Sequence, residues 1–258
     1  MPLFVEYRDL GRMDYAECWD LQRSIFDAML AAKALHGSNA PDGGICPAEV
    51  AGTGLPGPKA GTILTVEHPP VYTLGKHGHR SNMLASEERL RSLGADFYNI
   101  DRGGDITFHG DGQIVGYPIL DLEMLGIGLR EYVDALEQSV IDTLAGYGIR
   151  AGRSHGASGV WLGSGAEYAG GQAPENGGPL RKICAIGVKA SRYVTMHGFA
   201  LNVTTDLKWF GNINPCGFTD RGVTSMMREI GSAPDIDEVK RVLIDNLARI
   251  LNVKIYKN

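Results

Sequence analysis

Glycine constrains the fold of this chain more than any other residue type. The chain has 35 glycines among its 258 residues, about twice the usual share. Much of the excess lies in residues 37–61 and 163–178, which are rich in Gly, Pro, Ala and Ser and have little periodic hydrophobicity. Both stretches are predicted to be long loops or insertions. The other glycines are scattered through strand-like segments, where glycine weakens a strand unless something approaches the backbone closely.

Between these stretches the hydrophobic pattern predicts an α+β fold, in which helices pack against a mixed α/β sheet. Helical periodicity predicts helices at 13–35, 86–93, 129–147 and 235–252. Apolar and β-branched runs predict strands at 62–67, 71–74, 97–101, 105–109, 113–121, 158–162, 182–190 and 193–203. The run 113–121 is long and mostly apolar, which is typical of a central strand. No clean boundary divides these elements, so residues 1–258 are interpreted as a single domain.

Composition argues against several classes of protein. A net charge of −5 is unfavourable for nucleic acid as the main partner. No apolar run reaches the ~18 residues of a membrane span, and the first residues contain acidic side chains and no apolar signal core. We therefore expect a cytoplasmic protein with neither a nucleic-acid nor a membrane partner. The four cysteines are widely spaced without a C-x-x-C pair, so reduced thiols are expected.

Cys216 is the cysteine best placed for chemistry. Pro215 precedes it and Gly217 follows it, so it lies in a turn, at a surface or in a cleft. Cys184, between Ile183 and Ala185, is interpreted instead as a packing residue. A free thiol is only a few per cent thiolate at neutral pH, so a nucleophilic cysteine needs a basic or cationic neighbour. The alternative is a partly exposed turn cysteine without a catalytic role.

Three residues could serve as that neighbour: Lys182, His109 and His197. Lys182 begins an apolar strand, so its side chain either reaches out to solvent or is held in a site. It also belongs to residues 181–192, which carry four basic residues and no acidic one. This segment is either a landing surface for an acidic partner or the solvated edge of a strand.

Two further motifs carry weaker signals. Arg102, Gly103 and Gly104 lie between two predicted strands, where paired glycines either let a ligand lie against the backbone or form a hairpin. The strand-to-helix context of a dinucleotide site is missing. His77 and His79 lack the wider ligand set of a zinc site, so no metal is expected.

Four segments, in order, resemble the lipoyl(octanoyl) transferase family, whose members move an octanoyl group from acyl carrier protein to a lysine of lipoyl-bearing domains. They are EHPPVYTLGKHG (67–78), RGGDITFHGDGQIVGYPILDL (102–122), KICAIGVKASRYVTMHGFALNV (182–203) and NINPCGF (212–218). Together they cover most of the chain outside the two glycine-rich stretches. The resemblance implies a mixed sheet with helices, similar to the catalytic domain of biotin and lipoate protein ligases.

The resemblance also implies a role for particular residues. Cys216 would carry the acyl group as a thioester, and Lys182 would tune this cysteine and move protons. The acyl group would be bound by Arg102, Gly103, Gly104, Asp105, Ile106, Thr107, Phe108, His109, Ala185, Ile186, Gly187, Gly198, Phe199 and Ala200. No metal or cofactor is implied, because the donor thioester is already activated.

The implied donor is octanoyl-acyl carrier protein. The implied acceptors are the lipoyl domains of 2-oxoacid dehydrogenase E2 subunits and the glycine cleavage H protein, in the first step of endogenous protein lipoylation. The chain departs from the family at residues 37–61 and 163–178, which lengthen two connections, and at Asp105, where the family often has another polar residue. Two alternatives stay open: an ATP-dependent lipoate or biotin ligase, and a non-catalytic protein that binds lipoyl domains.

Overall fold

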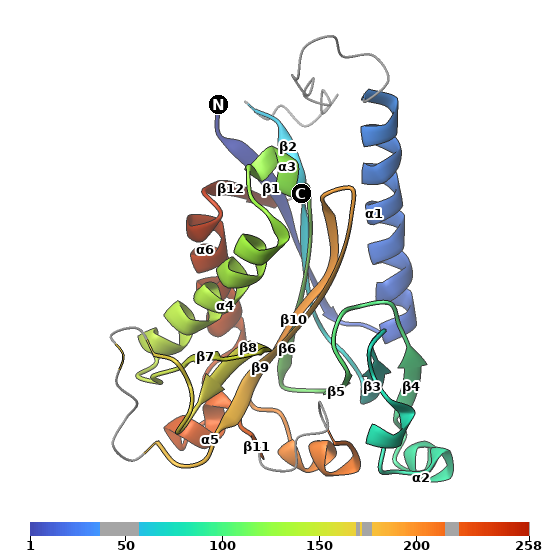
Figure 1. Ribbon diagram of the computed structural model, residues 1–258, viewed down its shortest axis with the longest axis vertical. Helices are drawn as coiled ribbons and strands as arrows, with labels where there is room; N and C mark the ends of the chain where they lie inside the picture. Colours follow the sequence, from blue (N-terminus) through green and yellow to red (C-terminus); the bar gives the residue numbers. More distant parts are fainter. Residues whose placement is uncertain (37–56, 169–170, 172–176, 215–221, 258) are drawn as a thin grey trace.

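A mixed β-sheet forms the centre of the molecule (Figure 1). The computed structural model describes residues 1–36, 57–168, 171, 177–214 and 222–257. Within these residues nine strands join one sheet, in the order β12-β1-β2-β6-β10-β9-β8-β7, with β11 paired to β9. Their bounds are β1 Leu3–Arg12, β2 Lys59–Glu67, β6 Gln113–Leu120, β7 Gly152–Ser154, β8 Ala157–Leu162, β9 Arg181–Ser191, β10 Val194–Asn202, β11 Gly222–Val223 and β12 Val253–Lys257.

Strand pairing in this sheet is partly parallel and partly antiparallel. β1 runs parallel to both β2 and β12, while β2, β6, β10, β9, β8 and β7 alternate in direction. Every residue of β6 is buried, which confirms the prediction of a central strand. The sequence patterns missed β1 and β12, which lie at the two ends of the chain and pair with each other in the sheet.

Helices cover both faces of the sheet, and this confirms the predicted fold class. α1 (Tyr15–His36) packs on one face against β6 and β10, while α4 (Leu129–Gly146) and α6 (Ile236–Ile250) pack together on the other (Figure 1). All three coincide with predicted helices. α6 begins where expected, because the Asp235 side chain accepts hydrogen bonds from the backbone N–H groups of Asp237 and Glu238. None of the helices in the described ranges is long and apolar enough to cross a membrane; the cytoplasmic location stays a prediction.

The shorter helical segments lie at the ends of the sheet and around the smaller sheet described next. They are η1 Arg80–Asn82, α2 Glu87–Ser92, α3 Leu122–Leu125, η2 Leu207–Asn212 and α5 Met226–Ile230. α2 matches the short helix expected at 86–93. Its Ser86 side chain accepts a hydrogen bond from the Arg89 backbone N–H, as an N-cap residue does.

A second, three-stranded sheet holds the glycine loop that contains Arg102. Its strands are β3 Val71–Leu74, β4 Asp96–Asn99 and β5 Ile106–His109, in the order β4-β3-β5. β4 and β5 therefore pair with opposite edges of β3 and not with each other. The hairpin interpretation of this loop is wrong, because residues 100–105 cross the end of β3. The crossing brings the backbone of Gly103 against β9.

The two glycine-rich stretches were predicted to be loops, but parts of each belong to a strand or pack against the main sheet. Residues 59–61 of the first stretch already belong to β2. In the second stretch, Ala166 and Tyr168 are buried against Trp161, and Arg153 and Glu167 form an isolated β-bridge. Residues 163–168 are thus packed against β7 and β8, beside the strand that carries Lys182.

Candidate active site

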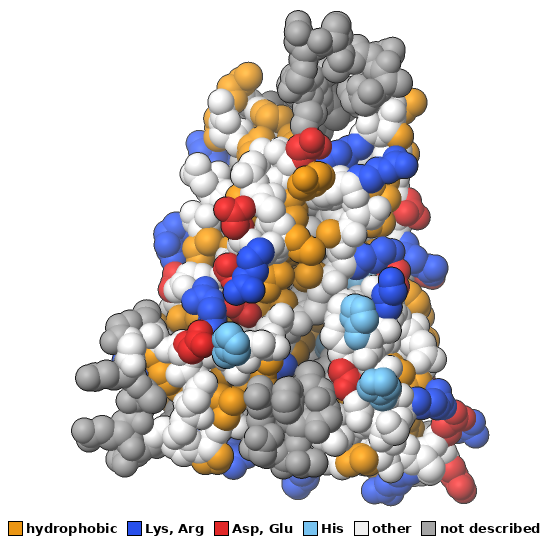
Figure 2. Space-filling model, in the orientation of Figure 1, with side chains coloured by type: hydrophobic (Ala, Val, Ile, Leu, Met, Phe, Trp, Pro, Cys, Tyr) orange, Lys and Arg blue, Asp and Glu red, His pale blue; other side chains and the backbone are white. Residues whose placement is uncertain are grey.

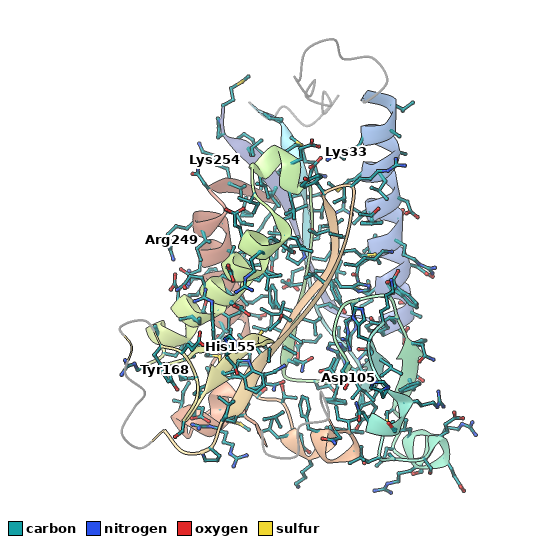
Figure 3. The ribbon with its side chains drawn as sticks, in the orientation of Figure 1. Lys33, Asp105, His155, Tyr168, Arg249 and Lys254 are labelled. Carbon is teal, nitrogen blue, oxygen red and sulfur yellow. The ribbon has the colours of Figure 1, made fainter. Side chains whose placement is uncertain are left out.

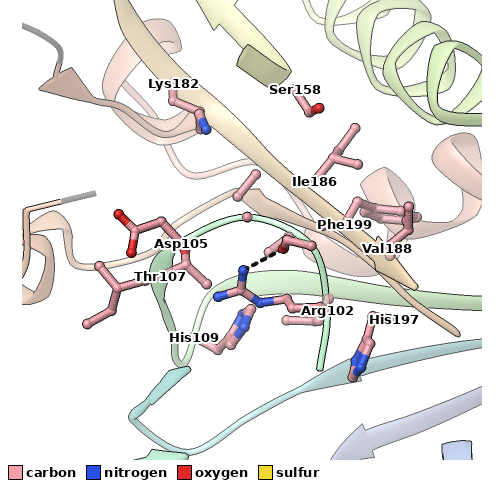
Figure 4. A pocket seen from close by; sticks show the side chains of 18 of the residues that line it. Arg102, Asp105, Thr107, His109, Ser158, Lys182, Ile186, Val188, His197 and Phe199 are labelled. Carbon is pink, nitrogen blue, oxygen red and sulfur yellow. Dashed lines mark hydrogen bonds between the residues drawn. The ribbon is translucent and has the colours of Figure 1, made fainter. Parts of the chain in front are cut away.

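A cavity of about 420 Å³ lies between β9, β10 and the loop that precedes β5 (Figure 4). It brings together segments that are far apart in the sequence. The predicted residues that line it are Arg102, Gly103, Gly104, Asp105, Ile106, Thr107, His109, Lys182, Ala185, Ile186, Gly187, Gly198, Phe199 and Ala200. Lys182 and Ser158 lie at one end and His197 at the other, with Ile186 and Phe199 between them.

Phe108 is the predicted wall residue that does not line the cavity. Successive side chains of a strand point to opposite faces, so Thr107 and His109 face the cavity while Phe108 points the other way. Its ring is fully buried and stacks on Trp209, with 5.2 Å between ring centroids. Phe108 therefore supports the wall from behind.

Main-chain contact, and not side-chain packing, fixes how closely the Arg102 loop approaches β9. The Gly103 N–H donates a 2.9 Å hydrogen bond to the Val188 carbonyl. A Cβ atom on Gly187 would lie 2.7 Å from the Gly103 carbonyl oxygen, closer than side-chain atoms normally come. The glycines of this wall are thus explained by two backbones in contact, as the scattered glycines of the sequence had indicated.

A similar close contact joins β6 to β10. Gly116 is the cross-strand partner of Phe199, and a Cβ atom on Gly116 would lie 2.1 Å from Cζ of the Phe199 ring. The absence of a side chain at position 116 therefore makes the space that the ring occupies, which is a known way for an aromatic residue to cover a strand glycine.

Arg102 ties the loop to the small sheet. Its guanidinium is largely buried and donates to the Thr73 carbonyl at 2.7 Å, to Thr73 Oγ1 at 3.0 Å and to the Gly103 carbonyl at 3.0 Å (Figure 4). Hydrogen bonds from a charged donor are stronger than neutral ones. Arg102 thereby holds the loop in the shape that lets Gly103 reach β9.

His109 is a neutral hydrogen-bonding residue within the wall. Burial lowers its pKa to about 3, so the ring is uncharged at neutral pH. Nδ1–H donates to Gln113 Oε1 at 2.9 Å, and the Gln113 amide donates to Asn202 Oδ1 at 2.8 Å. On the other side of the ring, Thr73 Oγ1 lies 3.4 Å from Nε2. A neutral His109 cannot supply the positive charge that would lower the pKa of a nearby thiol.

A second neutral histidine, His68, lies directly behind His109. The two ring centroids are 6.0 Å apart, and burial lowers the pKa of His68 to about 4. Its Nδ1–H donates to the Met13 carbonyl and its Nε2 accepts from the Tyr117 hydroxyl, both at 2.8 Å. Tyr117 itself lines the cavity, so this pair forms a rigid, uncharged support under one end.

His197 occupies the same end in an unusual backbone conformation. Its φ is +62°, a left-handed value that non-glycine residues seldom adopt in a strand. The backbone N–H donates to Gln22 Oε1 of α1, and Nε2 lies 2.9 Å from Asp101 Oδ1. Burial lowers the pKa of His197 despite this carboxylate, while the hydrogen bond with His197 lowers the pKa of Asp101.

Lys182 lies at the opposite end, beside an aromatic ring. It is partly buried, and its Nζ lies 4.5 Å from the centroid of the Trp161 ring. Asp105 and Thr107 line the same side of the cavity (Figure 4). Asp105 is held by a hydrogen bond from the His79 backbone N–H at 3.2 Å and by one from Asn82. Burial lowers the pKa of the other two proposed partners, His109 and His197, so Lys182 is the one whose side chain is ordinarily a cation at neutral pH.

Of the two cysteines contrasted above, the structure describes Cys184. Cys184 is fully buried in β9 and burial raises the pKa of its thiol to about 12, which confirms a packing role. Cys216 lies outside the described residues. The chain just before it is anchored, because the Asn214 N–H donates to the Asn82 carbonyl at 2.7 Å and Ile213 bridges Met83.

The basic residues of 181–192 do not form one continuous basic surface. Arg181 pairs with Glu229 at 2.6 Å, and Lys189 pairs with Asp101 at 2.6 Å. On the face of the molecule that Figure 2 displays, Lys and Arg side chains are mixed with acidic ones. The strand-edge interpretation therefore describes these residues better than a landing surface for an acidic partner.

Several residues that line the cavity were not singled out from the sequence: Tyr15, Gln113, Tyr117, Ser158 and Asn202. A period-2 count along residues 113–117 would have placed Gln113, Val115 and Tyr117 on one face. Among the residues described, no group of three or more His, Cys, Asp or Glu side chains could hold a metal ion, and His77 and His79 belong to no such group.

Comparison with known proteins identifies the family. The family described as "Lipoyl protein ligase A/B catalytic domain" matches residues 49–248. The chain is 46% identical to an octanoyltransferase of Flavobacterium johnsoniae over 97% of this chain and 98% of that protein. It is 48% identical to an octanoyltransferase of Bacteroides fragilis over 91% and 92%. An octanoyltransferase of Porphyromonas gingivalis is 49% identical over 92% of this chain, which spans only 42% of that protein's length.

Solved structures of lipoate ligases share the fold. A lipoate-protein ligase A bound with ATP matches with a TM-score of 0.61 and 13% identity, covering 100% of this chain and 89% of the other. The putative lipoate protein ligase Ta0514 of T. acidophilum, solved with bound lipoic acid, matches with a TM-score of 0.58 and 13% identity over 100% and 89%. These likenesses confirm the expected fold. From the family match and the full-length relatives, the chain belongs to the lipoyl protein ligase A/B catalytic domain family and, within it, to the octanoyltransferases.

Proposed function

We propose that this protein transfers an octanoyl group from octanoyl-acyl carrier protein to a lysine of a lipoyl domain, through a thioester on Cys216. The acceptors would be the lipoyl domains of 2-oxoacid dehydrogenase E2 subunits and the glycine cleavage H protein, and the transfer would be the first step of endogenous protein lipoylation. One observation carries the proposal: a cavity walled by the Arg102 loop, Ala185–Gly187 and Gly198–Ala200 has Lys182 at one end.

The cavity is long enough to hold an octanoyl chain. Lys182 and the far end near Val188 are six residues apart on β9, or ~20 Å at the rise of a strand. With C–C bonds of ~1.5 Å, an extended eight-carbon chain is at most ~10 Å long. The chain would lie along Ile186 and Phe199 with its carbonyl carbon near Lys182, and the backbone wall would exclude water from it.

The chemistry would proceed in two steps. In the resting enzyme the Cys216 thiol has already passed its proton to Lys182, which leaves a thiolate beside an ammonium, and the thiolate attacks the thioester carbon of the donor. The tetrahedral intermediate collapses, the C–S bond to the carrier breaks, and the Lys182 ammonium returns a proton to the departing thiolate. The octanoyl-Cys216 thioester is then attacked by the acceptor amine, which forms the amide, loses a proton to Lys182 and releases the cysteine. Backbone N–H groups of the cavity wall are the candidate donors to the oxyanion.

Intact-protein mass spectrometry tests the thioester. After incubation with octanoyl-acyl carrier protein and no acceptor, wild type should gain the mass of one octanoyl group and Cys216→Ala should gain none. Cys184→Ala is the matched control: its thiol is buried with a raised pKa, so a folded variant should still be acylated. Persistence of the adduct in Cys216→Ala would exclude the proposed nucleophile.

The same assay separates transfer from ligation. Addition of the acceptor domain should discharge the adduct and form octanoyl-lysine without ATP. A strict requirement for ATP would instead indicate a ligase that activates a free acid, and binding of the lipoyl domain without turnover would indicate a non-catalytic protein.

A further inference from the structure

Lys182 lies in an irregular part of the ladder between β8 and β9. Val160 pairs with Cys184 and Trp161 pairs with Lys182, so one step along β8 corresponds to two steps along β9. β-Bulges of this kind recur beside active sites, where they change the direction of a side chain. Gly159 lies next to the bulge with φ of +117°, and a Cβ atom there would be 2.5 Å from the Cys184 carbonyl and 3.5 Å from Cε of Lys182. The bulge and Gly159 together leave room for the lysine side chain against β8.

Trp161 is the residue on β8 that receives this side chain. The ring is only 2% exposed, and its Nε1–H donates to the Ala157 carbonyl at 3.3 Å. Ala166 and Tyr168 pack against it from the second glycine-rich stretch. The ring is thus held by its indole N–H and by this packing, and the Lys182 Nζ lies 4.5 Å from the ring centroid. The negative face of an indole attracts a cation at this distance.

We propose that Trp161 is a positioning residue, whose ring face holds the protonated side chain of Lys182 at the end of the acyl cavity. The proposal rests on the proton-transfer role of Lys182 proposed above. The ring favours the ammonium over the neutral amine, and it limits the directions in which the flexible side chain can point. Both effects keep the proton where the departing thiolate of the donor would need it.

Other charged or ionisable groups surround Lys182, and they affect the same equilibrium. Asp105 lines the cavity from the loop before β5. Cys184 lies two residues farther along β9, where its thiol experiences the charges of both Lys182 and Glu137 of α4. The Arg181–Glu229 ion pair lies next along β9 and links that strand to α5. Each of these groups is retained in the variants below, so their contributions cancel in the comparison.

The test is the pH dependence of acylation in a single turnover, with octanoyl-acyl carrier protein as donor, no acceptor, and correction for uncatalysed thioester hydrolysis. The rate should fall at high pH when Lys182 loses its proton. Trp161→Leu should move this fall to lower pH by roughly one unit, because the cation loses its aromatic partner. Trp161→Phe keeps a weaker ring face and should give a smaller shift in the same direction.

Tyr168→Leu is the matched control for damage to packing. Tyr168, labelled in Figure 3, belongs to the same cluster as Trp161, but its ring lies under the guanidinium of Arg150, whereas the Trp161 ring lies under Lys182. Its profile should fall at the wild-type pH; an equal shift in Tyr168→Leu would overturn the proposal. If Trp161→Leu does not fold, the smaller shift of Trp161→Phe decides, and its absence overturns the proposal.

Lys182→Arg distinguishes this inference from the proposed function. Arginine stays protonated across the range, so the fall at high pH should disappear, whatever rate remains. If the fall persists in Lys182→Arg, the role of Lys182 is wrong and the proposed function must change. If it disappears there but Trp161→Leu leaves it in place, the inference about Trp161 alone fails.

Discussion

At one end of the cavity a partly buried cation lies over an aromatic ring, whereas at the other end His109 and His197 are buried. The two ends differ in how freely their side chains can move. Lys182 has a flexible, partly buried side chain whose Nζ lies over the Trp161 ring. His109 is neutral and fixed by Gln113, and Arg102 is fixed by Thr73. The Lys182 end is therefore suited to moving protons, and the other end to holding a chain of constant shape.

The largest expected effect removes the movable charge. Lys182→Ala should lower the single-turnover rate of acylation by roughly a thousandfold, within the range for loss of a general acid–base group. Thermal stability should change little, because the side chain is only partly buried. Lys189→Ala, on the same strand but paired with Asp101, is the control and should react close to wild type. Equal rates in the two variants would contradict the contrast between the ends.

The next largest effect is a loss of folding stability at acid pH, which comes from the buried histidines at the fixed end of the cavity. The pKa values of His68 and His109 in the folded protein are about 4 and about 3, below the unfolded value of ~6.5. Since the unfolded chain binds these protons more readily, stability is fully present above about pH 6.5 and is lost as the pH falls toward the folded values. Between pH 7 and 5 the two groups together should cost about 4 kcal/mol.

Urea unfolding at pH 7 and pH 5 measures this loss, with the slope of each transition checked for two-state behaviour. His109→Gln keeps a polar side chain but cannot be protonated, so its stability should fall by about 2 kcal/mol less over the same interval. An unchanged pH dependence in this variant would mean that His109 is not held neutral in the folded protein.

A smaller effect is expected where the loop touches β9. Gly187→Ala places a Cβ atom against the Gly103 carbonyl, which should cost about 1–3 kcal/mol as overpacking does and weaken octanoyl binding. Gly146→Ala is the control: it ends α4 and a Cβ there meets nothing within 4 Å, so up to ~1 kcal/mol of stabilisation is expected. Calorimetric melting of both variants gives the comparison; a Gly187→Ala protein as stable as wild type would contradict a backbone-built wall.

The sequence patterns predicted the elements whose signal is local. Helical periodicity found α1, α4 and α6, and a continuous apolar run found β6. They failed where pairing depends on distant partners: β1 and β12 were missed, and the hairpin interpretation of the Arg102 loop was wrong because β4 and β5 both pair with β3. Local hydrophobicity contains no information on which strand will lie between two others.

The residues of the site divide in the same way, into those that sequence segments identified and those whose contacts depend on distant strand pairing. The four-segment resemblance identified the residues of the wall, and thirteen of the fourteen predicted binding residues line the cavity; Phe108 is the exception because strand alternation turns it away. Trp161 was not predicted to take part. Its contact with Lys182 depends on a one-residue bulge between β8 and β9, and a register of this kind is set by the whole sheet. The roles of Cys216 and of the wall residues stay predictions.

The contact between Gly116 and Phe199 restricts how the cavity can diverge among related proteins. Because the ring fills the space above the glycine, a larger residue at 116 is compatible only with a smaller one at 199, and the effects of the two substitutions cannot add independently. Single changes at either position should be selected against, whereas compensated double changes would alter the width of the cavity in one step. Acyl-chain preference in this family is therefore expected to change by paired substitution here, and a redesign for branched or aromatic acyl groups should begin with libraries that vary both positions together.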